Sequence, residues 1–237
     1  MNLNGKTAVV TGASSGLGRA FSRALTAKGC KVYGISRTAE KLEETRKAAG
    51  ERFVPVALDL SRAENIRHWV SETFTGQILP DVLINNAGAG YFAAVDALDD
   101  KKWHAMVETN INGMYYLTSA IVPLMKKNPE HCHIINIGSI LALVGAPERS
   151  AYSATKFAVR GFTESIAKEL RFEKIKVTCF NPGSIDTDFF RESGVEPHRR
   201  MLQPEDLANT LVHILETPDN FQVDEITIRP LNPRAPH

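Results

Sequence analysis

The sequence predicts an α/β fold with a doubly wound parallel sheet of about seven strands and helices on both faces. Short apolar runs rich in β-branched residues recur along the chain, and longer amphipathic segments separate them. Most of the short runs lack polar–apolar alternation, which is typical of strands that are buried on both faces of a parallel sheet. Strands and helices that alternate at this spacing favour parallel crossover units.

The elements follow one another in a regular order. Strands are expected at 6–11, 31–36, 53–58, 81–86, 133–138, 176–181 and 225–230. Helices are expected over about 16–28, 38–48, 61–76, 102–126, 152–172 and 204–216. Ser61 and Glu64 have the spacing of a capping box, and Pro204 before two acidic residues marks the last helix start. Because no linker interrupts the series, we expect a single domain over 1–237, with a short substrate lobe or lid at about 188–203.

Composition limits the partners and the compartment. The 237 residues carry a formal net charge of +1, so neither nucleic acid nor a membrane surface is expected as a partner. No apolar run approaches the length of a membrane span, and none near the N-terminus is long enough for a signal peptide. Cys30, Cys132 and Cys179 are widely spaced, which predicts no disulfide framework and favours the cytoplasm.

Two histidines could suggest a metal. His131 and His133 lie two apart at the start of a predicted strand and could face the same way. Active sites of doubly wound sheets lie at the opposite, carboxyl ends of the strands. We therefore expect ordinary edge histidines and no metal site.

A glycine-rich loop follows the first strand. TGASSGLG (11–18) places Gly12, Gly16 and Gly18 just before a predicted helix. Backbone amides at a helix N-terminus attract anions, and glycines allow a pyrophosphate to approach closely. The loop therefore indicates a dinucleotide site on a Rossmann-like sheet, although its spacing alone is also compatible with a structural tight turn.

The end of the second strand indicates which dinucleotide is bound. NAD sites usually have an acidic residue here for the ribose hydroxyls, but this strand ends in Ser36-Arg37-Thr38. Arg37 can pair with a 2′-phosphate through two hydrogen bonds, whereas an acid would repel it. The sequence thus favours NADP(H), and a solvated surface arginine is the alternative.

Further motifs in the same order make the sequence similar to the short-chain dehydrogenase/reductase family over nearly the whole chain. TGASSGLG matches that family's cofactor loop, and NNAG (85–88) matches its adenosine-side motif. NPGSIDT (181–187) resembles the segment whose threonine holds the nicotinamide carboxamide. The C-terminal VDEITIRPL resembles NADP-dependent 3-hydroxy acid dehydrogenases of the serine or allo-threonine type.

The resemblance implies a catalytic set and a cofactor site. The expected catalytic residues are Asn110, Ser139, Tyr152 and Lys156. The expected cofactor contacts are Gly12, Ser14, Ser15, Gly16, Leu17, Gly18, Arg37, Asp59, Leu60, Asn86, Ala87, Gly88, Tyr152, Lys156, Pro182, Gly183, Ile185 and Thr187. The implied reaction interconverts a small carbonyl compound and its alcohol by hydride transfer. Two alternatives stay open: a non-catalytic NADP(H)-binding regulator, and a redox-neutral enzyme such as an epimerase.

Tyr152 and Lys156 have the helical spacing of an acid/base pair. Positions i and i+4 share a helix face, so both side chains can meet one ligand. A phenol titrates near pH 10, and a nearby cation is expected to favour the phenolate. Ser139 would fix the substrate oxygen, and Asn110 would order a water that joins Lys156 to solvent. Ser153 and Lys156 also form S-x-x-K, but the S-D-N and K-T-G partners of that hydrolase motif are missing from the sequence.

Two segments are expected to select the substrate. Leu141 and Val144, between the catalytic serine and tyrosine, would provide an apolar lining. Arg191, Arg199 or Arg200, in the predicted lid, could clamp a carboxylate, although solvated arginines are the alternative. The apolar spacing of 113–125 fits a helix that is buried in the core or against another subunit. The resemblance implies a homodimer or homotetramer.

Overall fold

The structure is a computed structural model that describes residues 1–76, 78–189, 198 and 200–231. Its core is a seven-stranded sheet in the order β3-β2-β1-β4-β5-β6-β7, and every neighbouring pair is parallel. The strands are β1 (Thr7–Thr11), β2 (Lys31–Ser36), β3 (Phe53–Ala57), β4 (Val82–Asn85), β5 (Cys132–Ile137), β6 (Ile175–Pro182) and β7 (Glu225–Ile228). The predicted parallel sheet of about seven strands is therefore confirmed.

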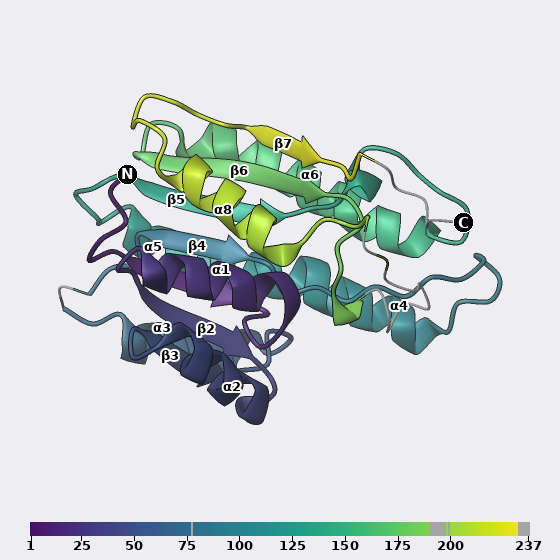
Figure 1. Ribbon diagram of the computed structural model, residues 1–237, viewed down its shortest axis with the longest axis horizontal. Coiled ribbons are helices and arrows are strands. Elements are labelled where there is room, and N and C mark those ends of the chain that lie inside the picture. The colour runs from purple at the N-terminus through teal and green to yellow at the C-terminus, as the bar shows by residue number, and fades with distance from the viewer. Residues whose placement is uncertain (77, 190–197, 199, 232–237) are drawn as a thin grey trace.

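Helices cover both faces of the sheet (Figure 1). The α-helices of the described residues are α1 (Gly16–Ala27), α2 (Ala39–Ala49), α3 (Ala63–Thr73), α4 (Asp100–Val107), α5 (Met114–Met125), α6 (Ser150–Leu170) and α8 (Pro204–Leu215). Buried side chains of α1, α2 and α8 pack in one hydrophobic cluster, and those of α3, α5 and α6 pack in a second. This division is the doubly wound arrangement that the sequence predicts.

Strand β1 shows why its run is apolar without alternation. Ala8 and Val10 belong to the cluster under α1, whereas Val9 belongs to the cluster on the other face. Successive side chains of a strand point to opposite faces, so a strand covered on both sides needs apolar residues at every position. The two outer strands, β3 and β7, have only partly buried patterns because each has one neighbouring strand.

The helix predicted over 102–126 is interrupted in the structure. Helix α4 ends at Val107, a π-helical turn occupies Glu108–Gly113, and α5 begins at Met114. The apolar period runs on through this turn, so the sequence pattern does not reveal the break. Single π-turns within helices often occur at functional sites, and this one holds Asn110 in a buried position.

The two helix-start predictions had different outcomes. The capping box of Ser61 and Glu64 is wrong, because α3 begins after an N-cap at Arg62 that makes no side-chain capping bond. Instead, Asp59 accepts a hydrogen bond from the backbone N–H of Ser61 at 3.0 Å and holds this turn. The start of α8 is confirmed, with Pro204 in its first turn and two acidic residues behind it.

Candidate active site

A cleft of about 530 Å³ opens at the carboxyl edge of the sheet, the edge toward which the strand arrows point in Figure 1. It lies across β1 and β4, where the strand order reverses, which is the usual ligand position in open α/β sheets. Nineteen of the predicted site residues line it: Gly12, Ser14, Ser15, Gly16, Leu17, Arg37, Asp59, Leu60, Asn86, Ala87, Gly88, Ser139, Leu141, Tyr152, Lys156, Pro182, Gly183, Ile185 and Thr187. Gly18, Asn110 and Val144 are the predicted residues outside this lining.

The glycine loop is shaped by close backbone contacts. Gly12 and Gly16 have φ values of +65° and +47°, a region that favours glycine. A Cβ on Gly18 would collide with the carbonyl of Gly12 and come within 2.7 Å of the Asn86 amide nitrogen. Gly18 thus packs α1 against the loop instead of lining the cleft. Arg19 supports the loop from outside by donating to the Ser14 carbonyl at 2.7 Å.

The loop offers polar groups to a pyrophosphate. Ser15 is the N-cap of α1, and its side chain makes no capping hydrogen bond, so the first amides of the helix face the cleft without a side-chain acceptor. Ser36 donates a hydrogen bond to the Ser14 hydroxyl at 2.9 Å, which joins the loop to the end of β2. These donors, together with the glycines that leave room for a ligand, fit a dinucleotide.

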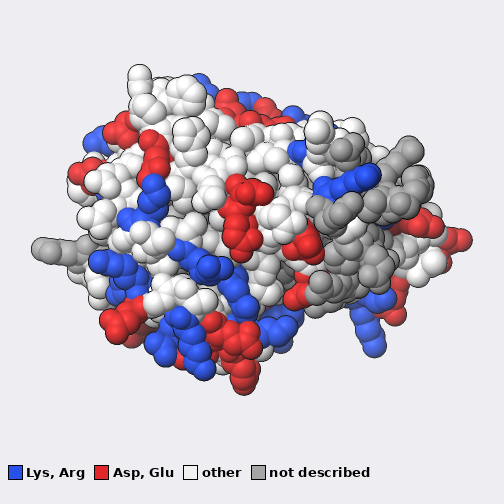
Figure 2. Space-filling model, viewed as in Figure 1, with Lys and Arg blue, Asp and Glu red and all other residues white. Residues whose placement is uncertain are grey.

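Arg37 follows β2 and lies on the rim of the cleft with Thr38 and Lys41. No ion pair within 4 Å joins Arg37 to a carboxylate of the described residues. Asp59 lies across from it, and the pKa of that carboxyl is lowered mainly by hydrogen bonding from Ser61, with smaller help from the charge of Arg37. Two cations, Arg37 and Lys41, therefore lie on this rim. Acidic and basic side chains are otherwise interspersed on this face of the molecule (Figure 2).

Three of the predicted catalytic side chains meet at the other end of the cleft. Ser139 lies two residues after the end of β5 and is only 8% exposed, and α6 brings Tyr152 and Lys156 (7% and 5% exposed) beside it. The Lys156 Nζ donates to the Ile137 carbonyl at 2.8 Å and lies 5.7 Å from the centroid of the Tyr152 ring. The i, i+4 spacing thus places both groups at one point, as expected from the sequence.

Burial dominates the electrostatics of this pair. It raises the pKa of Tyr152, and a hydrogen bond with Ser139 opposes that rise. Burial also lowers the pKa of Lys156 to about 8. The expected lowering of the tyrosine pKa by Lys156 is therefore not found in the protein alone. At neutral pH the tyrosine is a neutral phenol, which is the form that can give a proton to a carbonyl oxygen.

Asn110 lies beneath the cleft and makes a set of buried hydrogen bonds. Its Oδ1 accepts from the Ala89 N–H at 2.8 Å, and its Nδ2 donates to the Ala89 carbonyl and to the Thr155 hydroxyl, each at 2.9 Å. The side chain thus ties the segment after β4 to α6, one residue before Lys156. Both amide protons of Asn110 are used in these bonds, whereas its Oδ1 keeps one lone pair that could accept from a water joining Lys156 to solvent.

The substrate residues agree with the prediction only in part. Leu141 lines the cleft, whereas Val144 is 51% exposed and lies outside the lining, because the loop turns it toward solvent. Arg191 and Arg199 lie outside the described residues, and Arg200 is exposed and does not line the cleft. The structure adds Phe92 and Arg149, which sequence reasoning missed because nothing local marks either residue.

The S-x-x-K hypothesis has no structural support. Ser153 is buried, and its Oγ has no hydrogen-bond partner among the described residues. Lys156, which would have to activate it, donates to a carbonyl instead. A serine nucleophile needs a base within hydrogen-bond reach, and Ser153 lacks one in the described structure.

The histidine pair does not form a common site. His133 is fully buried in the central strand β5, so the expectation of an edge histidine is wrong for this residue. Thr178 donates its hydroxyl proton to the Val223 carbonyl, so it accepts from the Nε2–H of His133 at 2.8 Å. Burial lowers the pKa of His133 to about 3. Among the described residues, no group of three or more His, Cys, Asp or Glu side chains could hold a metal.

Known proteins with similar sequences and structures agree with this geometry. A family model described as short chain dehydrogenase matches residues 6–197. Farnesol dehydrogenase of Aedes aegypti is 34% identical over 96% of both chains. A 3-ketoacyl-(acyl-carrier-protein) reductase of Brucella melitensis, complexed with NADH, has a TM-score of 0.87 at 28% identity and covers 98% of this chain and 100% of its own. The closed form of a serine dehydrogenase complexed with NADP+ has a TM-score of 0.84 at 25% identity over 93% of both chains.

Proposed function

The chain belongs to the short-chain dehydrogenase family, and we propose that it is an NADP(H)-dependent oxidoreductase that interconverts a small carbonyl compound and its alcohol. One observation carries this proposal. Ser139, Tyr152 and Lys156 meet in the same cleft as the glycine loop and the segment that contains Thr187. A dinucleotide laid across the loop therefore ends beside a proton donor.

The chemistry divides between cofactor and protein. A bound nicotinamide would supply or accept the hydride at the carbonyl carbon. Tyr152 gives its hydroxyl proton to the carbonyl oxygen during reduction and takes it back during oxidation. Ser139 donates a hydrogen bond to the same oxygen and holds it in place. We expect the protonated form of Lys156 to favour proton release from the phenol only when the nicotinamide is bound, because this effect is not found in the protein alone.

The preference for NADP(H) is supported by charge at the adenosine end. Arg37 and Lys41 lie on this rim, and the residues after β2 provide no acid before Glu40. An arginine is well suited to pair with the 2′-phosphate that distinguishes the two cofactors. The serine dehydrogenase was complexed with NADP+ and the ketoacyl reductase with NADH, so the likeness in fold is compatible with either cofactor.

The proposal also covers the oligomeric state, the domain organisation and the cellular location. Tyr115 on α5 and Phe157 on α6 are 52% and 45% exposed, and such aromatic surface supports a homodimer or homotetramer through these helices. We also propose a single domain over 1–237 with a lid at about 188–203, most of which lies outside the described residues. We also retain a cytoplasmic location, because the three cysteines are buried and unpaired. None of the described helices is long and apolar enough to cross a membrane.

The test follows NADPH oxidation with a panel of aldehydes, ketones, dicarbonyls and oxo acids. We expect turnover of at least one compound, and Tyr152→Phe should abolish it while leaving NADPH affinity within about threefold, because the ring remains and only the proton is lost. Equal loss of turnover and NADPH binding would reject the proton-donor role. Tight NADPH binding without turnover of any compound would favour the regulator, and isomerisation without net NADPH oxidation would favour an epimerase.

A further inference from the structure

The guanidinium of Arg149 is a positive charge at the substrate end of the cleft. Arg149 is the N-cap residue of α6, three positions before Tyr152, and it lines the cleft together with Tyr152, Ser139 and Leu141. Residues three apart at a helix start lie on neighbouring parts of one face, with about 5–6 Å between Cβ atoms on a helix. The guanidinium is therefore within the reach of a small molecule whose carbonyl oxygen is bound by Tyr152.

An aromatic ring fixes the position of this guanidinium. The Arg149 Cζ lies 4.6 Å from the centroid of the Phe92 ring, and the Phe92 ring stands edge-on to Tyr152 at 5.5 Å between centroids. Arg149 also donates from Nη1 to the Pro147 carbonyl at 3.1 Å. A cation stacked on a ring keeps its outer N–H groups available while it loses little freedom on binding a ligand.

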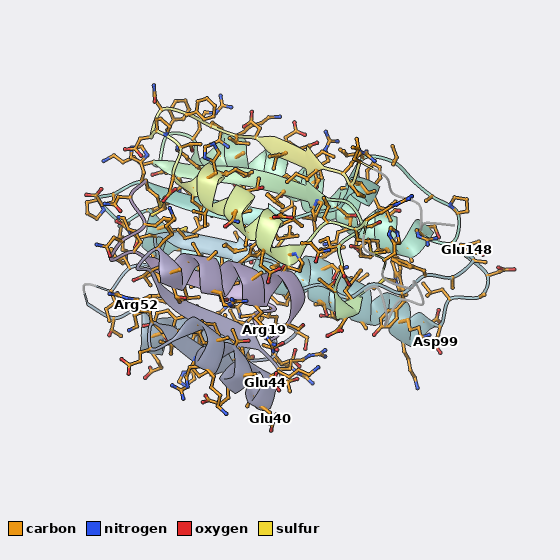
Figure 3. The ribbon with its side chains drawn as sticks, in the orientation of Figure 1. Arg19, Glu40, Glu44, Arg52, Asp99 and Glu148 are labelled. Atoms are coloured by element: carbon orange, nitrogen blue, oxygen red, sulfur yellow. The ribbon has the colours of Figure 1, made fainter. Side chains whose placement is uncertain are left out.

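The residue before Arg149 has a left-handed backbone conformation. Glu148 has a φ of +59°, one of two described residues other than glycine with positive φ. Its carbonyl accepts a hydrogen bond from the Ala93 N–H at 2.8 Å, which joins this loop to the segment that contains Phe92. Glu148 and Asp99 lie together at one end of the molecule in Figure 3. Backbone strain of this kind persists where the surrounding structure holds it, and such places are often ligand sites.

Among the residues that the structure describes, Arg149 has no acidic partner. No carboxylate of the described residues lies within 4 Å of it, although Glu148 is its neighbour in sequence. The other charged residues that line this end of the cleft are Lys156 and Asp188. An arginine that is stacked, partly buried and unpaired with a carboxylate is ready to bind one, and its planar fork matches the two carboxylate oxygens.

From this arrangement we propose that Arg149 is the anchor for a substrate carboxylate, so that the preferred substrates are small oxo acids and the corresponding hydroxy acids. This inference rests on the proposed oxidoreductase function and specifies its substrate class. The carbonyl accepts the hydride at carbon and the Tyr152 proton at oxygen, and the carboxylate remains unchanged on Arg149. Arg149 thus takes the role that the sequence suggested for an arginine of the lid.

The test compares oxo acids that have their carbonyl at carbon 3, 4 or 5 with their methyl esters, at saturating NADPH. The ester keeps the carbonyl but removes the charge. We expect the wild type to prefer at least one acid, and Arg149→Met to lower kcat/KM for that acid by about 10- to 100-fold, chiefly through KM. Activity on the ester should stay within about twofold, which also shows that the variant is folded. Arg149→Lys should give an intermediate loss, because it keeps the charge without the fork.

A matched control uses the other end of the same helix. Arg171→Met removes an exposed arginine at the C-terminus of α6 and should change neither activity. Equal loss of activity on the acid and on the ester in Arg149→Met would show that Arg149 has a structural role and does not bind the carboxylate. No loss of activity on either compound would show that Arg149 does not contact the substrate. Either result would overturn the proposal.

A binding measurement separates failure of the anchor from failure of the proposed reaction. If the wild type reduces no carbonyl compound, the proposed function fails, but the anchor is still tested by thermal unfolding of the NADP+ complex. The oxo acids should raise Tm of the wild-type complex and not that of Arg149→Met. Equal shifts in both proteins, or none in the wild type, would overturn the anchor.

Discussion

Reversal of the charge at Arg37 tests the cofactor preference most directly. Arg37 lies on the rim after β2, where the 2′-phosphate of NADP(H) would approach, and it forms no ion pair with the described carboxylates. Arg37→Asp replaces the proposed hydrogen-bond donor to this phosphate with a carboxylate, whose negative charge repels the phosphate. NADH has a hydroxyl at the same place, which a new carboxylate can accept from.

The size of the effect follows from the exposure of the site. Hydrogen bonds to charged groups contribute about 1.5–3 kcal/mol, which corresponds to roughly 10- to 150-fold in Kd. Arg37 is exposed, so solvent and salt reduce the value toward the lower end. Lys41 stays on the rim as a second cation. We therefore expect Kd for NADPH to rise about 10- to 50-fold and Kd for NADH to change by less than about threefold.

The assay measures Kd for both cofactors by fluorescence titration at two salt concentrations. The NADPH effect should shrink at high salt, because screening weakens the lost attraction. Arg52→Asp is the matched control, since it makes the same charge change at an exposed site near the amino end of β3, at the far end of the molecule from Glu148 (Figure 3). An unchanged ratio of the two Kd values in Arg37→Asp would remove Arg37 from the cofactor site, and an equal change in Arg52→Asp would show only a general charge effect.

Two further predictions concern buried polar side chains. Ser153→Ala should keep most of the NADPH oxidation rate and leave Tm unchanged or slightly higher, because its hydroxyl makes no hydrogen bond with the described residues; a folded but inactive variant would revive the nucleophile hypothesis. His133 should make the fold sensitive to acid, because its pKa of about 3 lies below the ordinary value of about 6.5, so the unfolded chain binds a proton first as the pH falls. The stability that this neutral histidine contributes is fully present above about pH 6.5 and is lost between about pH 6.5 and 3, which amounts to about 2–3 kcal/mol at pH 4.5. Between pH 7 and 4.5, the free energy of unfolding measured with denaturant should fall less for His133→Leu than for the wild type. An equal fall in both proteins would assign the acid sensitivity to other groups.

The features that could be predicted from the sequence depend on local patterns. The seven strands were predicted within one or two residues at each end, because strands buried on both faces need unbroken apolar runs. The glycine loop could also be predicted, because glycine adopts the positive φ of Gly12 and Gly16 without strain. The spacing of Tyr152 and Lys156 defines a shared helix face, and that geometry required no tertiary information.

The features that were missed depend on contacts between distant segments. The π-turn at Asn110 is held by hydrogen bonds to Ala89 and Thr155, and neither leaves a signal in the helical period. Arg149 lines the cleft and stacks on the ring of Phe92. The two residues are far apart in the sequence, so this contact could not be predicted from either segment. The exposed position of Val144 likewise depends on the path of its loop, whereas its apolar character suggested a lining residue.

The reversal of strand order between β1 and β4 separates the two tasks of the cleft. Arg37 follows β2 and lies on the other side of this reversal from β5 and α6, so in the proposed complex it contacts only the adenosine half of the dinucleotide. Ser139, Arg149 and Tyr152 all come after β4, so the groups that we propose to hold the substrate and move the proton belong to α6 and to the segment between β5 and α6. In this proposal, the residues for cofactor choice and for substrate choice belong to separate parts of the chain and share no side-chain hydrogen bond or ion pair in the described structure. Substitutions that alter one choice are therefore expected to combine additively with those that alter the other.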